Sequence, residues 1–224
     1  MSSPNADSSV NRRPISSRNH YWAQRLALYL TKKGISANRI SLASLIFAVI
    51  GFVALWLSAD ISLRWQPSLF VGAALCCQLR LLCNLLDGMV AMESSVRPPT
   101  GALWNEIPDR FSDILFFVGI GFAADDMTLA LVLSVLAVLL SYVREFGHGV
   151  DGSMDYVGPM AKPQRMALTT FVLLLASLVG VLPVLKTMGM TSSDVLSLGL
   201  WLMVFGCVGT LVRRLKRLVE RVSH

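Results

Sequence analysis

Oxygen-bearing side chains recur at helical spacing between residues 84 and 113 of a chain that is otherwise largely apolar. In the first half of this stretch one helix face is shared by residues at i, i+3, i+4 and i+7, namely Asn84, Asp87, Gly88 and Ala91. In the second half every fourth residue again marks one face, namely Gly101, Asn105, Asp109 and Asp113. Carboxylate and amide oxygens suit hard cations such as Mg²⁺ or Mn²⁺. Two such faces opposed across a narrow gap would form an oxygen-rich metal pocket.

The composition places these polar faces in a membrane protein. The 224 residues are 54% hydrophobic and 15% charged, and the mean hydropathy is +0.60. A soluble domain carries about 25% charged residues. Ionisable groups are costly at the edge of a bilayer, so those in the 84–113 stretch are functional candidates.

The apolar runs predict an all-α integral membrane protein with six transmembrane helices of about 20 residues each. The expected spans are 40–58, 67–92, 101–123, 127–146, 165–185 and 194–212. Residues 20–33 predict an amphipathic helix on the membrane surface, and residues 1–19 a disordered basic tail. A single membrane domain is therefore expected over residues 20–224.

The distribution of basic residues predicts the orientation of these spans. Seven basic residues precede the first apolar run and five follow the last, while only Arg64 and Lys186 of the 20 fall in the expected outside loops. This asymmetry favours both termini in the cytoplasm of a cell inner membrane. It also places both polar faces and an expected loop at 147–164 on the cytoplasmic side. A nucleic-acid partner is excluded, because no polar surface with interleaved aromatic residues accompanies the basic ends.

The 84–109 stretch resembles the signature of the CDP-alcohol phosphatidyltransferases, D-x-x-D-G-x-x-A-R-x8-G-x3-D-x3-D. Five of its eight positions match and every spacing is kept. The matching residues are Asp87, Gly88, Ala91, Gly101 and Asp109. The segment GISANRIS at 34–41 and the order of the elements are also similar to the family, so the resemblance covers about residues 20–220.

The resemblance implies transfer of a phosphatidyl or related phospho-alcohol group from a CDP-linked donor to a hydroxyl acceptor, with release of CMP. The donor is commonly CDP-diacylglycerol, so membrane lipid is an expected partner, and family members commonly form homodimers. Metal ions, Mg²⁺ or Mn²⁺, are expected at the first three signature positions, here Asn84, Asp87 and Asn105, with Asp109 as a further ligand or as the base. Gly88, Ala91 and Gly101 would let the nucleotide approach the helices closely.

Three positions depart from the signature: Asn84 and Asn105 replace aspartates, and Met92 replaces arginine. Four carboxylates would balance two divalent ions, whereas Asp87 and Asp109 supply two negative charges. Either the site binds one metal, or Asp113 or Glu106 makes up the missing charge. Asp113 is favoured as an accessory carboxylate, since it lies one turn beyond Asp109 on the same face. Alternatively, Asn84 and Asn105 are hydrogen-bonding partners between helices without a metal role.

Basic residues near the same end of the spans would bind the phosphates of the donor or acceptor, namely Arg144, Lys162 and Arg165. The positive-inside distribution alone also explains Lys162 and Arg165. Arg80, one turn before Asn84, is predicted to pair with a buried acid, Asp113 or Glu145.

Three other readings stay open from the sequence. The chain could be a diverged homologue that binds a lipid or a partner without catalysis, or a membrane hydrolase that uses water as the acceptor of a similar diphosphate. A small ion-coupled transporter is less consistent, because Asp87, Glu93 and Asp109 gather toward one side of the membrane.

Overall fold

The computed structural model describes residues 20–60, 64–93, 101–152, 154–182 and 189–223. The predicted disordered tail, residues 1–19, lies outside this part of the chain. The described ranges contain seven helices, in the order α1 (Tyr21–Lys32), α2 (Ala37–Asp60), α3 (Gln66–Glu93), α4 (Gly101–Ala124), α5 (Met127–Asp151), α6 (Lys162–Val181) and α8 (Ser192–Val222). The all-α prediction is confirmed.

Five of these helices are long and apolar enough to cross a membrane, namely α2, α3, α5, α6 and α8. The remaining long helix, α4, has 24 residues and carries Asp109, Arg110 and Asp113 within its first 13 residues. It packs in the same bundle, against α2 and α5. The protein is thus a helical membrane protein with five clear candidate spans, and six spans with both termini in the cytoplasm stay a prediction.

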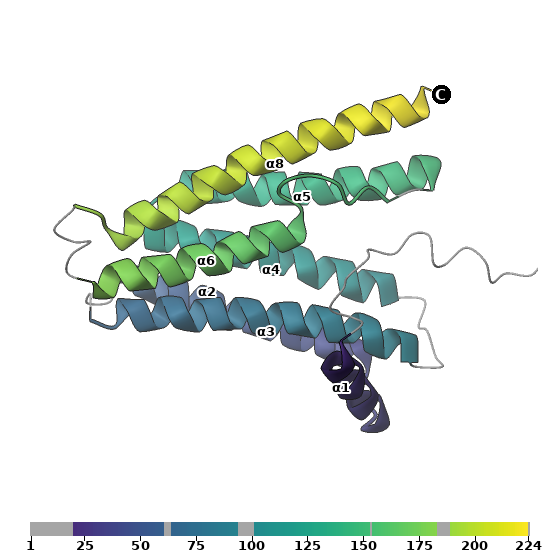
Figure 1. The fold of residues 1–224 in the computed structure, drawn as a ribbon, viewed down its shortest axis with the longest axis horizontal. Helices are drawn as coiled ribbons and strands as arrows, with labels where there is room; N and C mark the ends of the chain where they lie inside the picture. The colour runs from purple at the N-terminus through teal and green to yellow at the C-terminus, as the bar shows by residue number, and fades with distance from the viewer. Residues whose placement is uncertain (1–19, 61–63, 94–100, 153, 183–188, 224) are drawn as a thin grey trace, which may run out of the picture.

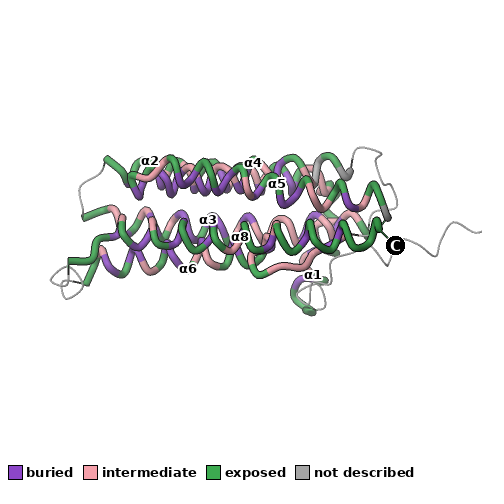
Figure 2. Tube along the Cα trace, turned by 90° about the horizontal axis from the view of Figure 1, so that it is seen from above, coloured by how far each residue is buried: buried purple, intermediate pink, exposed green. Residues whose placement is uncertain are grey.

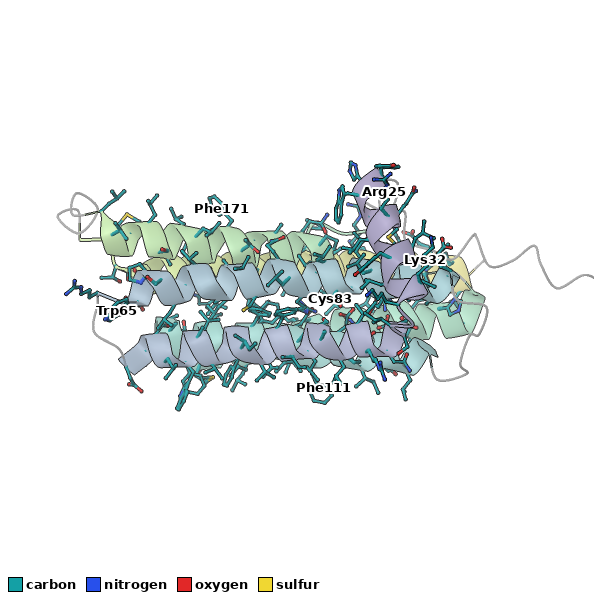
Figure 3. All side chains as sticks on the ribbon, turned by 90° about the horizontal axis from the view of Figure 1, so that it is seen from below. Arg25, Lys32, Trp65, Cys83, Phe111 and Phe171 are labelled. Atoms are coloured by element: carbon teal, nitrogen blue, oxygen red, sulfur yellow. The ribbon has the colours of Figure 1, made fainter. Side chains whose placement is uncertain are left out.

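The six long helices form two layers of three (Figure 1). Figure 2 shows α2, α4 and α5 in one layer and α3, α6 and α8 in the other, with buried residues between the layers and exposed residues outside. The layers are joined at both edges, where α2 packs against α3 and α5 packs against α8. Figure 3 shows Phe111 and Phe171 pointing away from the bundle on opposite sides, as expected of side chains that contact lipid.

Close packing of α2 on α4 depends on small residues in both helices. A Cβ atom added at Gly51 would lie 2.7 Å from the ring of Phe116, and one added at Gly119 would lie 2.9 Å from Leu55. In a membrane, where lipid is as apolar as the helix surface, such close backbone approach is a main source of helix association. Gly51 and Gly119 therefore allow α2 and α4 to pack closely.

The predicted amphipathic helix is present as α1, which crosses the bundle at the end where α3 finishes (Figures 1 and 3). Ala23 and Ala27 are buried against a small apolar cluster on α3 that includes Leu86 and Val90. Its aromatic residues Tyr21, Trp22 and Tyr29 remain exposed. Exposed aromatics beside basic residues are typical of a helix at a membrane surface.

The helix α5 and the loop that follows it differ from their predicted limits. The helix expected to end near residue 146 continues to Asp151 and ends at Gly152, which adopts the left-handed conformation (φ 73°) that favours glycine after a helix. The loop predicted at 147–164 therefore begins only at Gly152, and α6 starts at Lys162. The polar run that begins at Gly147 was predicted as a loop, yet Gly147 and Gly149 both lie within α5, where the cost of a glycine is small enough for packing to offset.

The loop that precedes α6 is hydrogen-bonded to α8, a single helix of 31 residues. The Met160 N–H donates to Thr210 Oγ1 at 2.9 Å, and Arg214 Nε donates to the carbonyl of Val157 at 3.0 Å. A Cβ at Gly158 (φ 141°) would lie 2.2 Å from Thr210, so only glycine allows this approach. The start of α6 is thereby fixed in position.

Candidate functional site

Two serines of α2 hold the polar face of α3. Ser41 Oγ donates to Asp87 Oδ2 at 2.7 Å, and Ser44 Oγ donates to Asn84 Oδ1 at 2.8 Å. Both pairs lie one turn apart on their helices, so the two helices meet in register. The contacts fix the side chains of Asn84 and Asp87 at the end of the bundle crossed by α1, where Figure 3 labels the neighbouring Cys83.

Asn84 also joins α3 to α4. Its side-chain Nδ2 donates to Asp109 Oδ1. Asp87, one turn along α3, lies within electrostatic range of both Asp109 and Lys162. The structure therefore brings together Asn84, Asp87 and Asp109 from the two faces that the sequence singles out.

Asp87 retains one open oxygen in this arrangement. The residue is 4% exposed, and among the described residues Asp87 Oδ1 has no hydrogen-bond partner. A buried carboxylate oxygen without a partner is costly unless a cation or a ligand satisfies it.

Asp109 is contacted by basic side chains from two other helices. Its Oδ2 accepts from Lys162 Nζ, at the first residue of α6. Its Oδ1 lies 3.5 Å from Arg80 Nη2, and its backbone carbonyl lies 3.2 Å from the same nitrogen. A carboxylate held by charged donors on both oxygens is firmly oriented.

Asp113 joins two buried arginines. Arg80 Nη2 donates to Asp113 Oδ1 at 2.6 Å, and Arg165 Nη2 donates to Asp113 Oδ2 at 3.0 Å. The side chains of Arg80, Asp113 and Arg165 are 0%, 3% and 2% exposed. The predicted pairing of Arg80 with a buried acid is confirmed, and the acid is Asp113. We call the five residues Arg80, Asp109, Asp113, Lys162 and Arg165 the inner network.

A second group of charges lies one turn earlier on α4. Glu106 pairs through Oε2 with Arg110 and through Oε1 with Arg144, the latter at 2.8 Å. Arg144 also contacts Glu145 at 2.6 Å and lies over the ring of Tyr156. The Glu106 and Glu145 side chains are 37% and 44% exposed. We call Glu106, Arg110, Arg144 and Glu145 the outer network.

The donor set fits a hard divalent cation at Asp87. Across the part of the chain that the structure describes, no three His, Cys, Asp or Glu side chains converge as a metal site, but amide and hydroxyl oxygens stand beside Asp87. The open Oδ1 is an oxygen ligand of the kind that Mg²⁺ or Mn²⁺ prefers. Asp109 is less accessible to a metal, because both its oxygens already accept from cations or amides.

The other predicted site residues are placed as follows. Gly88 and Ala91 lie half-buried on α3, and Gly101 and Asn105 lie in the first turns of α4, where the Asn105 side chain is outside the described set. Arg144 lies in the outer network, and Lys162 and Arg165 lie in the inner one. Sequence reasoning missed Ser41 and Ser44, although two small polar residues three apart in an apolar helix are a recognisable signal of helix contact.

No family model matches the chain. Among curated proteins it is similar to the inner membrane protein YnbA of Escherichia coli (strain K12), with 29% identity over 138 residues. The match covers 61% of this chain and 66% of the length of YnbA. This relative and the five candidate spans support a multi-pass membrane protein.

Solved structures of a phosphatidylinositol phosphate synthase, PgsA1 of Mycobacterium tuberculosis, have a similar fold. Its complex with manganese and citrate superposes with a TM-score of 0.67 at 22% identity and covers 88% of both chains. Its structure with CDP-DAG bound gives a TM-score of 0.62 at 22% identity, over 88% of this chain and 92% of that one. The chain thus shares the fold of a CDP-alcohol phosphatidyltransferase.

Proposed function

We propose that the protein transfers a phosphatidyl or related phospho-alcohol group from a CDP-linked donor, such as CDP-diacylglycerol, to a hydroxyl acceptor and releases CMP. The reaction would belong to phospholipid biosynthesis and take place at the cytoplasmic face of the inner membrane. The observation that carries the proposal is the buried Asp87 carboxylate beside Asp109 and Lys162, whose Oδ1 meets no hydrogen-bond partner among the residues that the structure describes. It is supported by the fold shared with a synthase that binds CDP-DAG.

Asp87 is proposed as the principal metal ligand, with Asn84 and Asn105 as the further candidates from the signature. When bound, Mg²⁺ or Mn²⁺ would neutralise the diphosphate and stabilise the leaving CMP. Ser41 donates to Asp87 Oδ2 and so aims the other oxygen of that carboxylate at the site. Such outer contacts normally orient a ligand and tune its affinity.

The start of α6 is proposed to bind the donor diphosphate. The N–H groups of a first helical turn and the helix dipole attract anions. Lys162 stands at this position, and Arg144 and Arg110 lie in the neighbouring outer network. Gly88, Ala91 and Gly101 would give the nucleotide close access to the two helices.

Asp109 is proposed to accept the proton of the acceptor hydroxyl, through an oxygen released from one of its basic partners. Asp113 is proposed as a positioning residue, because both its oxygens are engaged by Arg80 and Arg165. It would keep the two guanidinium groups in place while the substrates exchange. The homodimer implied by the family resemblance stays a prediction.

The test is CMP release by the purified protein in lipid nanodiscs, with labelled CDP-diacylglycerol, Mn²⁺ and a panel of alcohol acceptors. Asp87→Ala should lower the rate by roughly a thousandfold, because several kcal/mol of charge stabilisation is lost. Asp60→Ala, an exposed acid at the end of α2, is the matched control and should keep the native rate.

The remaining outcomes identify the alternatives. CMP and phosphatidic acid formed without any alcohol would indicate a diphosphate hydrolase. Folded protein that binds the labelled donor but releases no CMP with any acceptor would indicate a non-catalytic homologue. Unchanged CMP release by Asp87→Ala would contradict the assignment of the metal ligand.

A further inference from the structure

The charges around Asp87 balance without any metal ion. Three carboxylates lie there, Asp87, Asp109 and Asp113, and each sits beside basic side chains. The basic groups also number three: Arg80, Lys162 and Arg165. The formal charge of this group of six residues is therefore zero. In a site of low dielectric, each further ion must be matched by opposite charge.

The two acids that could restore the carboxylates missing from the signature are already engaged. Both oxygens of Asp113 accept from arginines. Both oxygens of Glu106 accept from Arg110 and Arg144. Neither acid can offer an unengaged oxygen to a metal without giving up an ion pair.

Lys162 already supplies a positive charge to Asp109, the carboxylate that a second divalent ion would use. Its ammonium contacts Asp109 Oδ2, while Asn84 and Arg80 approach Oδ1. The lysine is the first residue of α6, where a positive charge opposes the helix dipole, so the Asp109 carboxylate offsets an otherwise unfavourable position. An ammonium is a compact point charge with three donors, which suits it to a site among oxygen atoms.

We propose that Lys162 is a built-in cation that replaces the second divalent ion, so that each chain binds one divalent ion, at Asp87. The inference deepens the proposed function, since it concerns the same site. One divalent ion together with a diphosphate of about two negative charges leaves the group of six residues neutral. Two divalent ions would leave an excess of two positive charges next to buried arginines.

The same balance predicts how a second ion could be admitted. In the double variant Asn84→Asp/Lys162→Met one negative charge is gained and one positive charge is lost. Two divalent ions and the diphosphate would then again be neutral. The methionine side chain is unbranched, apolar and one atom shorter than that of lysine, and the carboxylate introduced at position 84 keeps an oxygen within reach of Ser44.

The experiment counts Mn²⁺ bound to purified protein in nanodiscs, with and without CDP-diacylglycerol, from the loss of the free Mn²⁺ signal in electron paramagnetic resonance. Native protein should bind one Mn²⁺ per chain, and the double variant two. Lys162→Met alone should bind its first Mn²⁺ about tenfold more tightly, because a competing cation is gone. Lys32→Met on α1, an exposed lysine, is the matched control and should bind like the native protein.

Two Mn²⁺ per native chain would overturn the inference, and so would a folded double variant that still binds one. Folding is checked by the size-exclusion profile and the thermal transition of each variant. If the double variant does not fold, the native count and the affinity of Lys162→Met decide. CMP release is scored separately, so one bound Mn²⁺ without CMP release would contradict the proposed function and leave this inference standing.

Discussion

The inner and outer networks contain the same kinds of ion pair, lie one turn apart on α4, and differ in burial. In the inner network Arg80, Asp113 and Arg165 are at most 3% exposed, whereas Glu106 and Glu145 of the outer network are 37% and 44% exposed. A buried charge that loses its partner is strongly destabilising, while an exposed pair contributes little. The inner network should therefore determine the geometry of the site, and the outer network its response to salt and ligands.

Asp113→Asn should cause the largest loss of stability. The change removes the carboxylate that Arg165 pairs with and leaves Arg80 with the 3.5 Å contact to Asp109. Breaking a buried pair by removing one partner costs about 3–5 kcal/mol. Chemical denaturation in detergent, followed by circular dichroism, measures the change. A loss below about 1 kcal/mol, the range of an exposed pair, would show that water or lipid headgroups reach the inner network.

An intermediate effect is expected from Thr210→Val on α8. The Met160 N–H, which is partly buried, would lose its acceptor in the loop that leads to Lys162. An unsatisfied donor costs about 1–3 kcal/mol when fully buried, so a loss of about 1 kcal/mol is expected here. The carbonyl of Met160 accepts from Arg165 Nη1 at 3.2 Å, so the loss should reach the inner network. Thr128→Val, at an exposed position, is the control. Equal stability of Thr210→Val and Thr128→Val would contradict the prediction that the loop before α6 supports the inner network.

The smallest effect is expected from Glu106→Gln, which makes in the outer network the same carboxyl-to-amide change as Asp113→Asn. Its cost should be below about 1 kcal/mol at low salt. The cost should vanish near about 1 M NaCl, because screening shortens the range of exposed charges to about 3 Å. A salt-independent loss as large as that of Asp113→Asn would remove the distinction between the two networks.

The sequence predicted the long apolar helices and the acidic and amide residues of the site. Apolar runs fix where long helices occur, and the helical spacing of Asn84, Asp87 and Asp109 indicated that their faces would meet. Helix ends were less predictable, since α5 extends through Gly147 and Gly149 to Asp151. Glycine inside a helix costs only about 1 kcal/mol, which packing readily offsets.

The pairing of Arg80 with Asp113 was among the predicted ones, whereas the partners that α6 supplies to the acids were not predicted. Arg165 reaches Asp113 across 52 residues of sequence, and Lys162 reaches Asp109 across 53. Such contacts depend on how α6 sits in the layer beside α3, which no local pattern encodes. From its spacing, Asp113 was favoured as an accessory carboxylate of the metal site. In the structure both its oxygens accept hydrogen bonds from arginines, Arg80 and Arg165.

The length of α8 has a consequence for the placement of the site. A helix of 31 residues measures about 46 Å, against about 30 Å for the hydrocarbon thickness of a bilayer. Its last turns, with Thr210 and Arg214 at their start, must project past the acyl chains. The loop before Lys162 is hydrogen-bonded to Thr210 and Arg214 in this part of α8. The position of the loop along the membrane normal therefore follows from the length of α8. Thinning or thickening of the surrounding lipid should tilt the bundle as a whole and leave the spacing between Lys162 and Asp109 unchanged.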